Sequence, residues 1–136
     1  MFDDLKSRCE AVEECYEFML AFAAQGVPTH TASESGERLH RLLAKAGEAI
    51  YGLAESYTVA MGESGLQPAS AYKAWGEVLA RDAASSLAAI HLVLAQPHIS
   101  SQLIDNLNAS IHLRALLTDL FLVDEILKGY EVVIPV

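Results

Sequence analysis

The chain has 136 residues, of which 52% are hydrophobic, and this length is enough for one domain with its own core. Eighteen acidic residues against nine basic ones give a net charge of −9, which repels phosphate backbones and anionic lipid headgroups. No apolar run is long enough for a membrane span, and the acidic start lacks the features of a signal peptide. We therefore predict a single soluble, cytoplasmic domain over 1–136, with neither nucleic acid nor membrane as a partner.

Glycine and proline residues divide the sequence into four stretches with helical periodicity. The first helix is predicted over 3–25, beginning at two aspartates that can cap it and ending before Gly26. Its core-facing stripe contains Leu5, Cys9, Val12, Tyr16, Met19 and Ala23. Cys9 and Cys15 cannot bridge, because on a helix they stand about 9 Å apart along the axis and about 120° apart around it. We interpret both thiols as small apolar side chains.

The second helix is predicted over 33–61, where Thr31 and Glu34 have the spacing of a capping box and two glycines close the helix. The core stripe contains Leu39, Leu42, Leu43, Ala46, Ile50, Leu53, Tyr57 and Met61. Three glutamates on the opposite side are expected to face solvent without binding metal: Glu37, Glu48 and Glu55.

The third helix is predicted over 68–96, opening at Pro68, a residue suited to the first helical turn. Its inward residues are Trp75, Val78, Leu79, Ser86, Ile90 and Val93. Asp82 falls among them and is the one polar misfit in the core pattern.

The fourth helix is predicted over 98–128, where a basic last turn is followed by Gly129. Apolar residues cover it nearly all round, in two arcs. One arc contains Leu107, Ile111, Phe121 and Leu122, and the other contains Leu113, Leu116, Leu120 and Leu127. The remaining segment, 129–136, is predicted to be an extended apolar tail, since it cannot be helical past Pro135. Four long helices with short connections predict an all-α, antiparallel up-down-up-down four-helix bundle.

A search for metal sites starts at Glu37 and His40, because Glu-x-x-His is the repeated unit of di-iron carboxylate bundles. The unit occurs once, whereas such a site needs two units and two further glutamates, all projecting inward. Glu37 points away from the core stripe, so we interpret this pair as part of a solvated face. His40, His91 and Asp105 should share one height along the bundle, but His91 points away from the inferred core and suits a surface or interface. We expect no metal and no cofactor.

Asp82 is the most informative polar residue of the pattern. The predicted helix heights place it opposite His112 and within a turn of Arg114, on the next helix. An unpaired buried carboxylate is far costlier than one paired with a guanidinium group. We therefore predict that Asp82 forms a buried polar pair with Arg114, or failing that with His112, and that this pair fixes helix register. The alternative is a polar pocket that binds a small ligand.

The sequence contains no glycine-rich phosphate loop, no serine elbow and no nucleophile with a base at a definable spacing. We name no catalytic residue and lean away from an enzyme. Tyr51, Tyr57, Tyr72 and Trp75 could line a cavity, but aromatic residues at helical spacing are usually core.

The doubly apolar fourth helix and the apolar tail indicate a contact surface. We predict a non-catalytic helical interaction module, such as an adaptor, chaperone-like or regulatory protein, that acts as a homodimer. Its oligomer interface is predicted at Leu113, Leu116, Leu120 and Leu127. The tail is predicted to assist through Tyr130, Val132, Val133, Ile134 and Val136. The alternative function is a bundle that binds a small ligand or metal, or acts as an enzyme, around Asp82, Arg114 and His112 or around the His40 and His91 layer.

Overall fold

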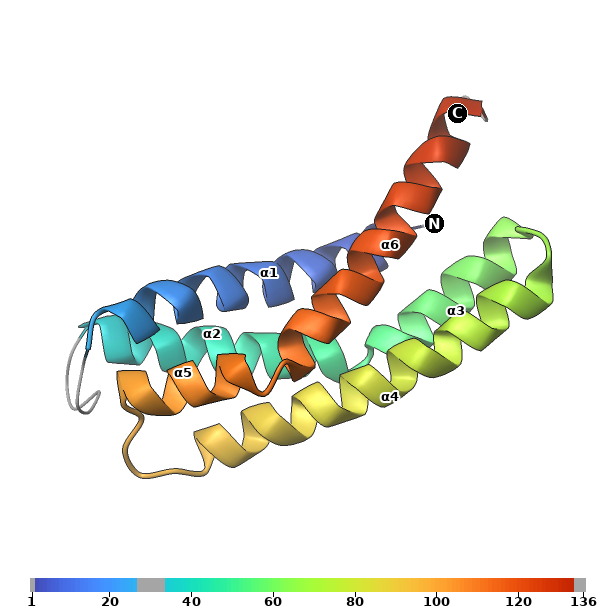
Figure 1. Cartoon of the computed structure of the whole chain (residues 1–136). Helices are drawn as coiled ribbons and strands as arrows, with labels where there is room; N and C mark the ends of the chain where they lie inside the picture. Colours follow the sequence, from blue (N-terminus) through green and yellow to red (C-terminus); the bar gives the residue numbers. More distant parts are fainter. Residues whose placement is uncertain (1, 27–33, 134–136) are drawn as a thin grey trace.

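A computed structural model of the chain describes residues 2–26 and 34–133, with side chains as far as Tyr130. These residues form α-helices and no strand, which confirms the all-α prediction. The helices are α1 (Asp3–Ala24), α2 (Glu34–Tyr51), α3 (Leu53–Ser64), α4 (Ala69–Leu94), α5 (Ser101–Ala109) and α6 (His112–Val133) (Figure 1). The predicted count of four is wrong, because the predicted second and fourth helices are each divided in two.

The first division lies at Gly52, between α2 and α3. The guanidinium group of Arg8, on α1, lies against this break: its Nη1 donates hydrogen bonds to the carbonyls of Ala49 at 3.0 Å and Glu48 at 3.4 Å. Asp4 orients the same guanidinium group through a 2.9 Å ion pair with Nε. A Cβ atom at Gly52 would approach Arg8 Nη1 to 2.7 Å. The break is therefore a place where α1 satisfies carbonyl groups near the end of α2.

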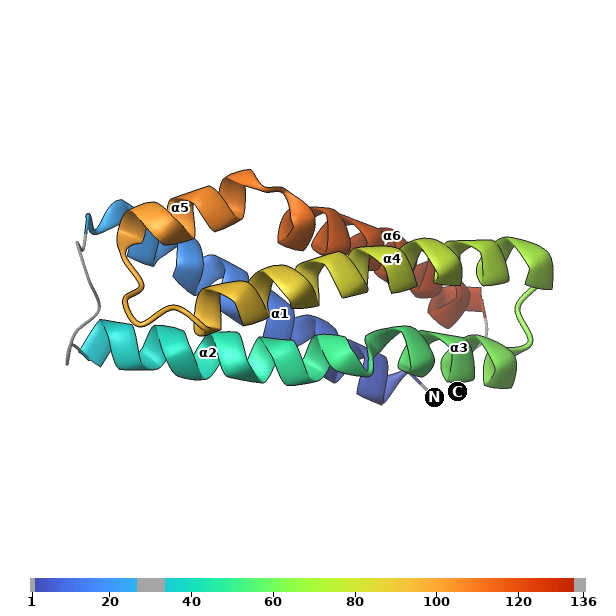
Figure 2. The same cartoon turned by 90° about the horizontal axis from the view of Figure 1, so that it is seen from below.

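The second division lies at Ser110 and Ile111, between α5 and α6. Ile111 has a φ angle of +66°, a left-handed conformation that is strained for a β-branched residue. Ser110 closes α5, because its hydroxyl group donates to the carbonyl of Leu107. In Figure 2, α5 and α6 are separated by a bend and do not form one continuous rod. The side chains of α6 therefore do not continue the helical phase of α5.

The C-terminal tail differs from the prediction. α6 continues through Gly129 and ends at Val133, so residues 130–133 are helical and not extended. Proline lacks the N–H group that would bond the carbonyl four residues earlier, and it disfavours helical geometry at the residue before it, so Pro135 is compatible with a helix that ends at Val133. Residues 134–136 lie outside the described part of the chain.

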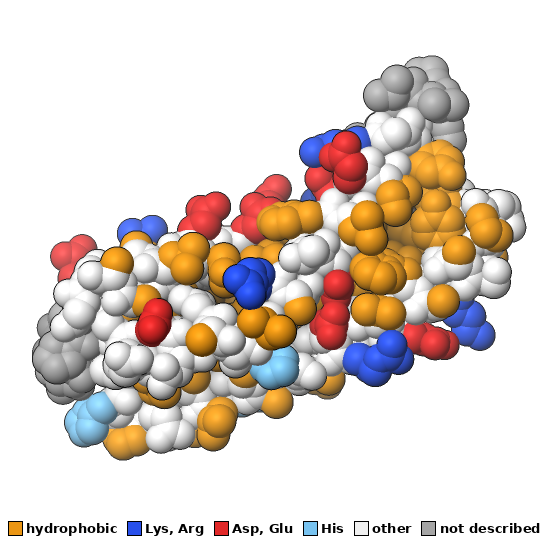
Figure 3. Space-filling model, viewed as in Figure 1, with side chains coloured by type: hydrophobic (Ala, Val, Ile, Leu, Met, Phe, Trp, Pro, Cys, Tyr) orange, Lys and Arg blue, Asp and Glu red, His pale blue; other side chains and the backbone are white. Residues whose placement is uncertain are grey.

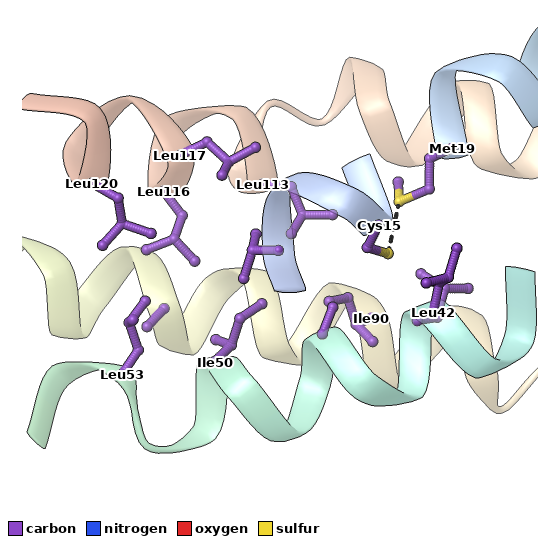
Figure 4. Packing of buried hydrophobic residues seen from close by; sticks show 14 of the residues in the cluster. Cys15, Met19, Leu42, Ile50, Leu53, Ile90, Leu113, Leu116, Leu117 and Leu120 are labelled. Carbon is purple, nitrogen blue, oxygen red and sulfur yellow. Dashed lines mark hydrogen bonds between the residues drawn. The ribbon is translucent and has the colours of Figure 1, made fainter. Parts of the chain in front are cut away.

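The core lies where α1 packs against α2, α5 and α6, and where α4 packs against α2, α3 and α6. The predicted inward stripe of α2 and α3 is confirmed, with every member buried except Met61, which is partly buried. Figure 4 shows the core residues from four helices: Ile50, Leu53, Ile90, Leu116 and Leu120. Cys15 lies in the same core and its thiol donates to Met19 Sδ at 3.7 Å (Figure 4). No helix in the described ranges is both long and apolar enough to cross a membrane.

Candidate interaction surface and carboxyl pair

The four leucines predicted to form the oligomer interface lie in the core of the single chain. Leu113, Leu116, Leu120 and Leu127 are between 0% and 4% exposed. Figure 4 shows the first three beneath α6, among side chains of the other helices. The interface prediction for these residues is wrong because it treated α5 and α6 as one helix. The break at Ile111 changes the phase, so Leu107 of α5 and these leucines of α6 face the same core.

The exposed hydrophobic residues of α6 lie around the part of the helix that these leucines leave uncovered. Phe121 is 47% exposed, Leu122 49%, Ile126 40% and Tyr130 37%. At about 100° per residue they extend around the helix from Phe121, on the outward side, through Leu122 to Ile126 and Tyr130, on the side of α4. We call these four residues the α6 apolar face. Figure 3 shows hydrophobic side chains gathered around a hollow between α6 and the end of the molecule where α3 joins α4. An apolar surface that continues from a helix into a hollow is typical of a site that contacts another molecule.

The hollow is a groove of about 300 Å³ between the start of α4 and the C-terminal half of α6. We call it the α4–α6 groove. Its walls come mainly from Ala71, Tyr72 and Trp75 of α4 and from Leu122, Ile126 and Leu127 of α6. The volume is at the lower end of the range for small-molecule sites. Two residues of the α6 apolar face, Leu122 and Ile126, thus also line this groove.

Aromatic residues build the α4 side of the groove. The Tyr57 side chain, on α3, is buried and its hydroxyl group donates to the backbone carbonyl of Tyr72 at 2.7 Å. Burial, together with the neighbouring phenol of Tyr72, raises the pKa of Tyr57 to about 12. Hydrogen bonding to Tyr130 raises the pKa of Tyr72, so the phenol of Tyr72 on α4 lies close to that of Tyr130 on α6. The interpretation of the aromatic residues as core holds for Tyr57 and is wrong for Tyr51, which is 84% exposed.

Trp75 is partly buried against the core and also lines the groove. Its indole Nε1 is buried, and no described residue accepts a hydrogen bond from it. A buried N–H group without an acceptor costs about 1 to 3 kcal/mol. An acceptor brought by a bound molecule would remove this cost.

Asp82 meets a carboxyl group and not a cation. Asp82 of α4 is half-buried, while Asp119 of α6 is only 9% exposed. Burial, a hydrogen bond to Asp82 and the negative charge of Asp82 raise the pKa of Asp119 to about 7. Oδ2 of Asp119 is buried, and no N–H or O–H group of the described residues donates to it. Two facing carboxyl groups in this setting favour sharing one proton over carrying two charges.

The predicted partners of Asp82 lie elsewhere. Arg114 and His112 are both exposed, and among the described residues neither forms an ion pair with Asp82. The backbone carbonyl of His112 does contact α4, since it accepts a 2.9 Å hydrogen bond from the buried Ser86 hydroxyl group. The break before α6 explains the difference, because it changes which α6 residues face α4. Asp119, five residues after Arg114, takes the position opposite Asp82.

The other candidate residues do not come together as a ligand set. His40, His91 and Asp105 are exposed, as are Glu37, Glu48 and Glu55, which face solvent as predicted. In the described ranges, no three His, Cys, Asp or Glu side chains lie close enough to hold a metal ion. The Nε2 atom of His91 lies near Gly47 on α2.

The two cysteines are free thiols. Burial raises the pKa of Cys9 to about 11 and that of Cys15 to about 12, so both thiols are protonated near neutral pH. This agrees with their interpretation as apolar side chains. Of the predicted tail contacts, Tyr130 is hydrogen-bonded to Tyr72, which lines the groove. The side chains of Val132 and Val133 are not described, and Ile134 and Val136 lie outside the described residues.

No protein-family model matches this chain, and comparisons with curated proteins and with solved structures give no match either.

Proposed function

We propose that this chain is a non-catalytic helical interaction module, and that it works as a homodimer. The contact surface in this proposal is the α6 apolar face together with the neighbouring α4–α6 groove. The observation that carries the proposal is the exposure of Phe121, Leu122, Ile126 and Tyr130 within three turns of one helix, beside an apolar groove. Burying such a surface against protein is favourable by about 25 cal/mol per Å² of apolar area removed from water.

The charge of the chain supports a protein partner over nucleic acid, because a net charge of −9 repels phosphate groups. We also propose a cytoplasmic location and a bundle of four antiparallel rods. In that arrangement α2 with α3, and α5 with α6, each form one broken rod. The packing of α1 on α2 and of α4 on α2, α3 and α6 supports it.

Self-association tests the proposal directly. Light scattering at about 10 to 500 µM chain should give a mass above that of a monomer, rising with concentration. Phe121→Glu with Leu122→Glu should return the mass to that of a monomer, because both side chains would bring charge into the contact. The control is Leu92→Glu, since Leu92 is 67% exposed on α4 and lines neither surface. A wild-type chain that stays monomeric over this range would overturn the homodimer.

A second candidate function, binding of a small apolar ligand, is favoured by the unpartnered Nε1 of Trp75. Such a ligand would carry a hydrogen-bond acceptor, such as a carbonyl group, and would fill the α4–α6 groove. Trp75 is the one tryptophan of the chain, so its fluorescence reports on the groove without labelling. The neutral ketone dye Prodan should quench this fluorescence by energy transfer in the wild type. Quenching that is unchanged in Ile126→Glu would place the dye outside the groove and count against this candidate.

A further inference from the structure

The outward side of α6 carries a charge pattern that suits a second copy of the same helix. Arg114 and Glu125 are eleven residues apart, which on an α-helix is about 17 Å along the axis and about 20° around it. Both side chains are exposed, and among the described residues neither has an ion-pair partner. Thr118 and Phe121 lie between them on the same side.

The charge balance of this helix differs from that of the whole chain. Between His112 and Tyr130, α6 carries the cations Arg114 and Lys128 and the anions Asp124 and Glu125, besides the buried Asp119. The outward side of α6 is therefore close to neutral, whereas the chain has a net charge of −9. Two copies can approach through this side with little of the repulsion that their acidic surfaces would produce elsewhere.

We infer that the partner of the outward part of the α6 apolar face, around Phe121 and Leu122, is α6 of a second copy, packed antiparallel about a two-fold axis midway between Arg114 and Glu125. This inference rests on the proposed interaction module and specifies its contact. In an antiparallel pair with this axis, Arg114 of each copy faces Glu125 of the other, so the contact contains two equivalent ion pairs. Thr118 of each copy then faces Phe121 of the other, next to the axis. The pattern is self-complementary, as an isologous interface requires.

In this arrangement the hydrophobic contacts supply the buried apolar area, and the ion pairs set the relative direction of the two helices. Phe121 and Leu122, each about half exposed in the single chain, supply most of the apolar area at the centre. The two ion pairs stand at the ends of the contact and set its direction, since a parallel pair would place Arg114 beside Arg114. A contact built on one helix from each copy is small, so we expect a dimer that dissociates in the micromolar range.

A charge-exchange experiment tests the pairing. Arg114→Glu places two glutamates opposite each other, and Glu125→Arg places two arginines opposite each other. Each single change should raise the dimer dissociation constant by at least about tenfold, because both ion pairs become repulsive. The double variant Arg114→Glu, Glu125→Arg should restore the wild-type value, because both pairs re-form with their charges reversed.

Two features of this design separate the pairing from general charge effects. Glu125→Arg makes the chain less acidic, so general repulsion would predict tighter association where the pairing predicts weaker association. Arg41→Glu, an exposed position on α2, makes the same charge change as Arg114→Glu and should leave the dissociation constant within about twofold. Sedimentation equilibrium gives the constants, and circular dichroism confirms the helix content of each variant.

The outcomes distinguish this inference from the proposed function. If the wild type dimerises but the single variants do so equally well, or the double variant fails to recover, the antiparallel pairing is wrong and the interaction module stands. If the wild type remains a monomer, the homodimer itself is wrong and the pairing falls with it.

Discussion

The facing carboxyl groups of Asp82 and Asp119 make the stability of the fold depend on pH in an unusual direction. The pKa of Asp119 is about 7 in the folded chain, against an ordinary value of 3.8. The folded state therefore binds a proton more tightly than the unfolded state does. The stability that this proton contributes is complete below about pH 4 and is lost as the pH rises through about 7.

The size of the effect follows from the difference between the two pKa values. At about 1.4 kcal/mol per pH unit, a rise from 3.8 to about 7 corresponds to roughly 4 kcal/mol. Asp119→Asn keeps the shape of the side chain but cannot acquire the buried negative charge. Its amide group can also donate a hydrogen bond to Asp82. We expect the variant to be more stable than the wild type by up to about 4 kcal/mol at pH 8.

Urea unfolding between pH 4 and 8.5, followed by circular dichroism at one chain concentration, measures this difference. The stability of Asp119→Asn minus that of the wild type should be small near pH 4, increase between about pH 4 and 7, and then stay constant. Taking the difference removes the titration of groups that the two chains share. Asp105→Asn is the matched control, because Asp105 is exposed on α5, and its difference should stay within about 0.5 kcal/mol at every pH.

A difference that does not change with pH would refute the raised pKa. Destabilisation by Asp119→Asn at pH 8 would refute the facing carboxyl pair itself, since it would mean that the Asp119 carboxylate has a favourable partner in the folded chain.

Three further predictions concern packing between helices. Arg8→Met should lower the free energy of unfolding in urea by about 1 to 3 kcal/mol, because the carbonyls of Glu48 and Ala49 at the α2–α3 break would lose a charged hydrogen-bond donor. An unchanged urea midpoint would mean that water replaces the guanidinium group as the donor. Gly47→Ala should stabilise the chain by up to about 1 kcal/mol, because its Cβ would meet no atom closer than 3.7 Å. Gly76→Ala should instead destabilise the chain by about 1 to 3 kcal/mol in thermal unfolding, because the new Cβ would lie 3.0 Å from the ring of Tyr57. That ring cannot move easily, since Tyr57 is buried and hydrogen-bonded. Equal melting temperatures for the two alanine variants would contradict this account.

The sequence by itself determined the all-α class, and it determined the inward faces of the segments in which the helical periodicity continues without a change of phase. Leu39, Leu43 and Ile50 recur at helical spacing and are buried, while Glu37 and Glu48 on the opposite side face solvent. Periodicity succeeds here because it depends on local geometry alone: each turn of a helix repeats the direction of the turn before it.

The tertiary structure decided where a helix stops and restarts, and with it which residues meet across helices. The break at Ile111 left little mark on the sequence, since an isoleucine at a positive φ angle is a conformation that packing imposes against local preference. Because of that break, Leu113 and Leu116 point toward the core, Phe121 and Leu122 are exposed, and Asp119 lies opposite Asp82. A hydrophobic pattern gives the direction of a side chain only relative to its own helix. The partner of that side chain depends on how the helices are placed relative to one another, which is a property of the packed molecule.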